Sequence, residues 1–89
     1  MIAISFSSSF KRSFKKLFKN KPKLEKVFWS KTNTFIKNPY HPSLKTHKLT
    51  GELKHLWSFS VEYDCRVIFY FEEENKIVFT AIGNHDAVY

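Results

Sequence analysis

A histidine and a tyrosine stand near the end of this 89-residue sequence, in the segment Gly83-Asn84-His85-Asp86-Ala87-Val88-Tyr89. The imidazole of His85 can accept or donate a proton near neutral pH, and the phenol of Tyr89 can assist by hydrogen bonding. The sequence has a net charge of +7 and a single cysteine. This combination favours metal-free acid/base chemistry on a polyanion, and RNA is the natural candidate.

Three segments in the C-terminal half have the patterns of β-strands and must position these groups. Residues 55–62 alternate between apolar and polar side chains, whereas residues 66–71 and 77–82 are rich in β-branched and aromatic residues. One face of the resulting sheet is apolar and takes the helices. We expect the other face to be an open, polar groove.

The turn between the first two strands determines the register. A two-residue turn would put Arg66 beside Val61 in the apolar layer, where an unpaired charge is costly. We therefore predict a three-residue turn, Tyr63-Asp64-Cys65, which places Glu62 opposite Arg66 on the open face. The other expected pairs are Val61 with Val67, Phe59 with Phe69, Phe69 with Phe79 and Ile68 with Thr80.

This register brings an acid, a fixed cation and a titratable ring to one end of the sheet. Glu62 and Arg66 become cross-strand neighbours, and His85 leaves the third strand near Asp64. Cleavage of RNA by its own 2′-hydroxyl needs a base, an acid and positive charge at the phosphate, and it requires no metal or cofactor. Taken alone, Glu62 with Arg66 is also an ordinary ion pair, and Asp64 an ordinary turn residue.

Three further polar residues, His47, Lys48 and Lys54, lie around the Thr50-Gly51 turn. They are placed where an RNA phosphate would need hydrogen-bond donors, although they can equally be solvated neighbours of the turn. The four histidines and Cys65 show no paired ligand spacing, so no metal site is predicted. With two glycines in the sequence there is no phosphate-cradling loop, and no cofactor is expected.

The N-terminal half is mainly helical in pattern. Residues 2–6 read as a short strand, and one of Ser7-Ser8-Ser9 can cap the helix that follows. Pro22 suits the first turn of a second helix, which Asn38-Pro39 ends, and an additional short strand is expected over 47–49. The main order is β-α-α-β-β-β, an α+β fold with a helical hairpin on one face of a mainly antiparallel twisted sheet.

Length and composition limit the class of protein. The 89 residues, 43% of them apolar, suffice for one core, so we expect a single domain over residues 1–89. Cys65 has no partner for a disulfide within the chain, which favours a reducing compartment, the cytoplasm. The apolar run from Ile2 to Phe6 is too short for a signal peptide or a membrane span, so no membrane association is expected.

The charge is unevenly distributed along the sequence. Residues 1–60 contain thirteen Lys/Arg and two Glu, whereas residues 61–89 contain two Lys/Arg and six acidic residues. A basic surface of this kind attracts nucleic acid or an acidic protein at long range. A solubilising lysine coat on amphipathic helices explains part of the same charge, so charge alone identifies no function.

Together these residues resemble the RelE/ParE superfamily of type II toxin-antitoxin toxins, particularly the RelE-like branch that includes YafQ-type messenger-RNA endonucleases. The resemblance covers nearly the whole chain, and its motifs are specific in this order rather than singly. They are Ser7-Ser8-Ser9-Phe10-Lys11-Arg12, Asn38-Pro39 followed by His47-Lys48-Leu49-Thr50-Gly51, Leu56-Trp57-Ser58-Phe59, Tyr63-Asp64-Cys65-Arg66-Val67-Ile68-Phe69, and the terminal Gly83-Asn84-His85-Asp86-Ala87-Val88-Tyr89.

The resemblance implies a toxin that enters the ribosomal A site and cuts messenger RNA, restrained by a cognate acidic antitoxin in a hetero-oligomer. His47, Asp64 and His85 resemble the histidine, aspartate and histidine of the YafQ pattern. Arg66 resembles the strand arginine of RelE, and Tyr89 resembles the C-terminal aromatic residue of both.

Ser60 departs from this pattern, because YafQ-like toxins have a further histidine there. In the implied mechanism Arg66 stabilises the phosphate, and His85 acts as general acid or base with help from Tyr89. The second proton-transfer group stays open among Asp64, Glu62 and His47, while Lys48 and Lys54 would bind the RNA backbone.

Two alternatives remain open at this point. The same superfamily includes ParE-like inhibitors of DNA gyrase and catalytically silent proteins that keep the fold, and a fold by itself does not separate these functions. A basic nucleic-acid-binding regulator without enzymatic activity is the third reading.

Overall fold

The protein folds as two α-helices packed against one sheet, in a computed structural model that describes residues 2–84. The order of elements confirms the expected α+β class. The elements are β1 (Ala3–Phe6), α1 (Ser8–Phe18), α2 (Pro22–Lys37), η1 (Pro42–Leu44), β2 (His47–Lys48), η2 (Gly51–Leu53), β3 (Trp57–Glu62), β4 (Cys65–Glu73) and β5 (Lys76–Gly83), where η marks a short 3-10 helix.

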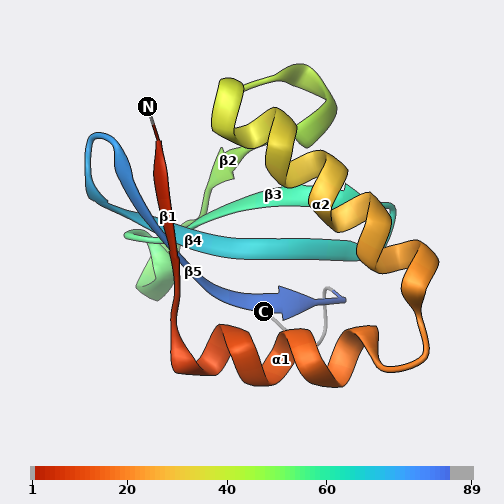
Figure 1. Cartoon of the computed structure of the whole chain (residues 1–89). Helices are drawn as coiled ribbons and strands as arrows, with labels where there is room; N and C mark the ends of the chain where they lie inside the picture. Colours follow the sequence, from red (N-terminus) through yellow and green to blue (C-terminus); the bar gives the residue numbers. More distant parts are fainter. Residues whose placement is uncertain (1, 85–89) are drawn as a thin grey trace.

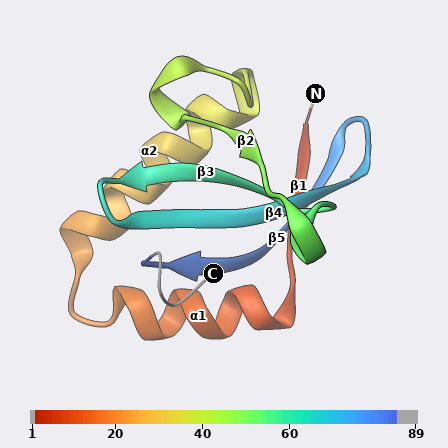
Figure 2. The same ribbon diagram turned by 180° about the vertical axis from the view of Figure 1, so that it is seen from behind.

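The five strands of the described chain form one sheet in the order β1-β5-β4-β3-β2. β1 is parallel to β5, and the other neighbours are antiparallel. Figure 1 shows α2 crossing one face of the sheet, with α1 lying along the β5 side. Figure 2, seen from behind, shows β3, β4 and β5 without a helix in front of them. We call this side the open face.

The helix ends follow the sequence signals. The Ser7 hydroxyl accepts a hydrogen bond from the Phe10 backbone N–H at 3.0 Å, which caps α1. After α1 the backbone of Asn20 takes a left-handed conformation with φ of 59°, which asparagine tolerates better than most residues. α2 then begins at Pro22 and ends at Lys37, just before Asn38-Pro39. No helix within residues 2–84 has the length and hydropathy needed to cross a membrane.

The core under the helices is built largely from phenylalanine rings. Phe79 is fully buried, and its ring centroid lies 5.5 to 6.3 Å from those of its ring neighbours. These neighbours come from both helices and three strands: Phe6, Phe10, Phe35, Phe59 and Phe69. Phe79 therefore connects both layers of the fold.

Serine side chains of α1 form hydrogen bonds with the backbone of β5 where β1 no longer pairs with it. β1 pairs only as far as Phe79. Past it, the Ser9 hydroxyl donates to the Thr80 carbonyl at 2.8 Å, and the Ser13 hydroxyl accepts from the Ile82 N–H at 3.1 Å. Since exposed strand edges readily pair with other chains, these contacts close the edge and hold the end of β5 in place.

The register of the β3–β4 hairpin differs from the predicted one. Ser60, rather than Glu62, lies opposite Arg66, and Glu62 lies opposite Cys65 across a two-residue turn. A β-bulge between Ser60 and Glu62 leaves Val61 as an extra residue. The prediction of a three-residue turn was wrong because it allowed only an unbroken ladder. Its physical premise was correct, since the bulge keeps Arg66 out of the apolar layer.

The other predicted pairs fare unevenly for the same reason. Phe69 lies opposite Phe79 as expected, but Ile68 lies opposite Ala81 rather than Thr80. A second bulge at Thr80, whose hydroxyl donates to the Ile68 carbonyl at 3.2 Å, shifts the ladder and lets Ile82 join the core.

The two remaining core pairs of the β3–β4 hairpin were also wrong, each by two residues. Phe59 lies opposite Val67, and Trp57 lies opposite Phe69. The predicted faces are nevertheless kept, since a shift of two residues preserves the alternation of a strand.

Replacing Phe79 by alanine should reduce the free energy of unfolding by about 3–5 kcal/mol, because it leaves a cavity among the core rings. Urea denaturation followed by circular dichroism measures this loss. The matched control is Tyr63→Ala, since Tyr63 is 98% exposed and its removal should change the stability by less than about 0.5 kcal/mol. Equal effects of the two variants would contradict the assignment of the core.

Candidate functional site

Arg66, the second residue of β4, is the main candidate for a functional residue on the open face. It lies opposite Ser60 on β3 and Gly83 on β5. Its Nη1 donates to the Ser60 hydroxyl at 3.0 Å, whereas its buried Nε has no hydrogen-bond partner in the described part of the chain. A guanidinium carries five N–H donors, and a buried donor without an acceptor costs about 1–3 kcal/mol. The side chain is therefore suited to take an anionic ligand.

His47 lies on the same face as Arg66. It pairs with Ser58, which in turn pairs with Ile68, two residues along the strands from the row of Ser60 and Arg66. Strand and residue spacings put the Cα atoms of His47 and Arg66 about 12 Å apart. His47 Nδ1 is 3.0 Å from the Lys45 carbonyl, which leaves Nε2 as the ring nitrogen for other partners.

A buried hydroxyl, that of Ser58, lies beside these two groups. Ser58 pairs with His47 and is two residues from Ser60, the strand partner of Arg66. Ser58 is fully buried, and its Oγ has no hydrogen-bond partner within residues 2–84. Buried polar atoms are normally hydrogen-bonded, so Ser58 Oγ and Arg66 Nε on one face are two exceptions that need a physical explanation. Ser58 is fully buried and out of reach of a surface ligand, whereas the half-buried Arg66 can take one.

Glu62 does not form the predicted pair with Arg66. The bulge turns it toward Cys65, and the single ion pair within residues 2–84 is Glu73 with Lys76, at 3.7 Å. Glu62 is exposed and still lines a cavity that Arg66 also lines. Asp64, the other predicted carboxylate, is exposed in the turn between β3 and β4.

The open face is less polar than predicted. Ile68 and Val78 are only 3% and 9% exposed, although neither belongs to the core cluster under the helices. Ile68 lies between Arg66 and Tyr70 along β4, so short apolar side chains fill the spaces between longer polar ones. The polar side chains of β4 on this face, Arg66 and Tyr70, are therefore separated by an apolar one.

Of the two lysines predicted to bind RNA, Lys48 is in β2 and Lys54 lies beyond it. Lys48 pairs with Trp57 and, with His47, lines a cavity of about 330 Å³ that also includes Leu49, Thr50 and Leu53. Lys54 follows η2 and is exposed. The structure therefore places Lys48 next to His47 but gives Lys54 no position in this cavity.

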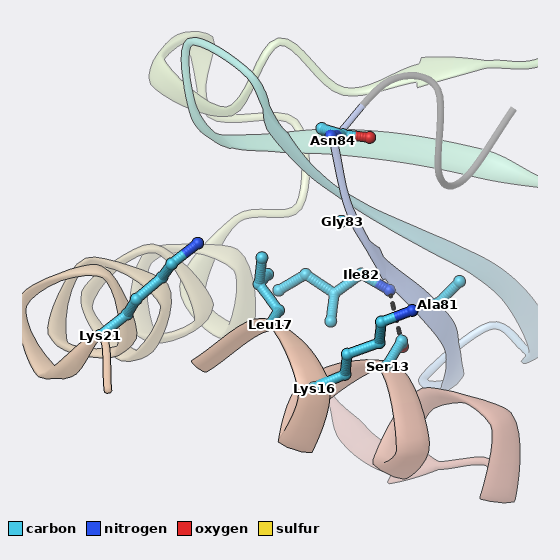
Figure 3. Close-up of a pocket in the computed structure, with 8 residues that line it drawn as sticks. All are labelled: Ser13, Lys16, Leu17, Lys21, Ala81, Ile82, Gly83 and Asn84. Atoms are coloured by element: carbon cyan, nitrogen blue, oxygen red, sulfur yellow. Dashed lines mark hydrogen bonds between the residues drawn. The ribbon is translucent and has the colours of Figure 1, made fainter. Parts of the chain in front are cut away.

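His85 and Tyr89 lie outside the described residues. The described chain ends beside a cavity of about 460 Å³ between α1 and the end of β5. Figure 3 shows that Asn84 lies at one side of this cavity, with Ser13 and Lys16 approaching from α1. Since Gly83 is paired with Arg66, the chain leaves the sheet one strand away from the guanidinium.

Sequence reasoning missed four residues that join Arg66 in space. Lys31, Ser43, Lys45 and Tyr63 line a cavity of about 300 Å³ together with Ser60, Val61, Glu62 and Arg66. They come from α2, the η1 segment and the β3–β4 turn, so no spacing in the sequence connects them. The presence of an aromatic residue in a polar turn, Tyr63, is the only signal that could have suggested one of them.

The remaining titratable group of note is a buried thiol. Burial, reinforced by the nearby carboxylates of Glu62 and Asp64 and opposed by Lys21, raises the pKa of Cys65 to about 11. The thiol is therefore protonated at neutral pH and is not a nucleophile. Within residues 2–84 no group of three His, Cys, Asp or Glu side chains could hold a metal ion.

Comparison with solved structures defines the class of fold. The chain superimposes over its full length on a metal-bound toxin from Helicobacter pylori with a TM-score of 0.81 at 25% identity, covering all of that chain. YafQ from E. coli gives a TM-score of 0.81 at 22% identity, with 100% of this chain and 99% of that one covered. YafQ in the E. coli DinJ-YafQ complex gives a TM-score of 0.75 at 23% identity, with the same coverage of both chains. The fold is that of RelE-like type II toxins.

A family model then gives the particular family. The model described as "Bacterial toxin of type II toxin-antitoxin system, YafQ" matches residues 2–89. The chain belongs to this YafQ toxin family. A comparison with curated protein sequences gives no significant match.

The raised pKa of Cys65 predicts a pH-dependent loss of stability. Because the folded thiol holds its proton up to about pH 11, its contribution is complete below the ordinary pKa of 9.0 and is lost as pH rises from 9 to 11. Urea unfolding of wild type and Cys65→Val should show that wild type loses about 2–3 kcal/mol more across this interval. If the two proteins lost stability equally between pH 9 and pH 11, the pKa of Cys65 would not be raised.

Proposed function

We propose that this YafQ-family toxin is an endoribonuclease that cuts messenger RNA in the ribosomal A site and so inhibits translation. The observation that supports the proposal best is Arg66 itself. It is a fixed cation on the open face, held by Ser60, with no acidic partner and with a buried Nε–H that lacks an acceptor within residues 2–84. A scissile phosphate provides both the charge and the acceptor.

In the proposed reaction the ribose 2′-oxygen attacks the adjacent phosphorus while a base removes its proton. The bond from phosphorus to the 5′ oxygen breaks, and an acid protonates that oxygen, which leaves a 2′,3′-cyclic phosphate and a 5′-hydroxyl. Arg66 stabilises the extra negative charge on the phosphate as it develops. Acid/base groups suffice for these steps, so the proposal includes no metal ion or cofactor.

The proton-transfer roles are assigned from chain position and face. His85 is two residues beyond Gly83, the strand partner of Arg66, and we assign it as general acid or base with Tyr89 assisting. His47 is the preferred second group because it shares the open face with Arg66. Asp64 in the adjacent turn is the alternative. Glu62 is less suitable, because its strand partner is Cys65 and not Arg66.

An acidic antitoxin is the proposed protein partner, in a cytoplasmic hetero-oligomer. Toxins of the same fold have been solved with partners, in the E. coli DinJ-YafQ complex and in the Staphylococcus aureus YoeB-YefM complex. The net charge of +7 would attract an acidic chain and increase its rate of association. Lys48 and Lys54 are proposed to contact the RNA backbone when the antitoxin is absent.

Replacing Arg66 by alanine should abolish growth arrest and reduce messenger-RNA cleavage by about 100-fold or more, because it removes charge stabilisation at the phosphate. The measurement is primer extension on cellular messages after induction of the chain without an antitoxin. The matched control is Arg12→Ala, the other arginine in the sequence, which is exposed on α1 and should leave cleavage unchanged.

Replacing His85 by alanine in the same assay tests the proton-transfer assignment, and cleavage should again be lost. Codon-linked cuts that persist at the wild-type level in both variants would exclude this mechanism. Growth arrest with DNA damage and without RNA cuts would instead support a ParE-like action on DNA gyrase.

A further inference from the structure

A cleft on the β3 side extends the open-face site away from Arg66. Its cavity of about 300 Å³ is lined from α2 by Lys31, from the η1 segment by Ser43 and Lys45, and from the β3–β4 hairpin by Ser60, Glu62, Tyr63 and Arg66. It exists because β2 pairs only with Trp57 and Ser58, so the rest of β3 has no strand on that side in the described chain. We call it the Lys31–Lys45 cleft.

The cleft is electropositive. Three cations, Lys31, Lys45 and Arg66, face a single carboxylate, Glu62. None of them takes part in the one ion pair formed within residues 2–84, which lies at the other end of β4. Cations gathered around a concave surface attract phosphates more strongly than the same charges scattered over a convex one.

Lys45 adopts a left-handed backbone conformation, which is unfavourable for lysine. Its φ of 51° and ψ of 40° are left-handed, and the residue lines the cleft. Non-glycine residues in this region are strained, and strain of this kind is frequent at functional sites. Glycine would fit the backbone better but would remove the charge.

An aromatic ring lies at the rim of the same cleft. Tyr63 is 98% exposed at the tip of the β3–β4 turn and contributes to the cavity lining. The hydrophobic effect disfavours such a ring in water, whereas an unpaired nucleic-acid base can stack on it favourably. Phosphate-binding cations beside an exposed ring are the two components of single-strand recognition.

We propose that the Lys31–Lys45 cleft binds single-stranded RNA next to the scissile phosphate, with Lys31 and Lys45 contacting a backbone phosphate and Tyr63 stacking on an unpaired base. The inference rests on the proposed endonuclease function and adds the path of the substrate. The Ser60 hydroxyl, which accepts from Arg66, has its own proton free to donate along that path. The RNA then runs from Arg66 toward α2.

Fluorescence anisotropy with a labelled, single-stranded 2′-O-methyl RNA tests this path. The probe lacks a free 2′-hydroxyl, so it reports binding without cleavage. Lys31→Ala with Lys45→Gly should weaken binding at least 10-fold and reduce the salt dependence of log K by about 0.7 for each phosphate that is no longer neutralised. Lys26→Ala, on α2 but outside the cleft, is the matched control and should have little effect.

Three single variants separate binding from structure. Lys45→Gly should keep or raise the melting temperature while it weakens binding, a combination that a purely structural role of Lys45 does not produce. Tyr63→Ala should weaken binding about 5-fold or more and Tyr63→Phe should not, since stacking needs only the ring. Equal losses in Lys26→Ala and Lys31→Ala, or equal binding to single-stranded and duplex RNA, would overturn the proposal.

The outcomes for the cleft and for catalysis are distinguishable. If wild type cuts messages but the cleft variants bind the probe normally, the substrate path is wrong and the endonuclease proposal is unaffected. If the cleft variants lose binding but no RNA cuts are found with wild type, the cleft binds RNA and the catalytic proposal fails.

Discussion

A guanidinium cannot be placed among the phenylalanine rings of this core without a large desolvation cost, and the β3–β4 hairpin is built around that constraint. A two-residue turn continued as an unbroken ladder would put Arg66 opposite Val61. The chain keeps the short turn and inserts Val61 as a bulge, so that Arg66 lies opposite Ser60 and the face beneath the helices stays apolar. Bulges that redirect a side chain in this way are frequent beside active sites.

The other contacts place groups around that arginine. Serines of α1 hold the edge of β5, and this fixes Gly83 beside Arg66 at the point where the chain continues toward His85. The short β2 places His47 on the same face and leaves the rest of β3 uncovered on one side within the described residues. The proposed reaction and the proposed substrate path both depend on these placements.

The sequence was sufficient for the fold class, the helix limits and the family resemblance, because these depend on periodicity, caps and ordered motifs. Ser7, Pro22 and Asn38-Pro39 act where they were expected to act. The bulges at Val61 and Thr80 could not be predicted from the sequence, because the position of a bulge depends on the packing of side chains on both faces of the sheet. For the same reason Glu62 was misplaced, and Lys31, Lys45 and Tyr63 were not connected with Arg66. The expectations on His85 and Tyr89 lie outside the described residues and stay predictions.

The central claim is that the Arg66 guanidinium receives a phosphate on the open face. Nuclear magnetic resonance of the ¹⁵N-labelled protein observes the arginine Nε–H directly, and Arg12 provides an internal reference in the same spectrum. On addition of single-stranded 2′-O-methyl RNA, we expect the Arg66 Nε–H signal to move downfield and to exchange more slowly with water, while that of Arg12 stays unchanged. An unchanged Arg66 signal when the RNA is fully bound, with shifts confined to α1 or η2, would contradict the claim.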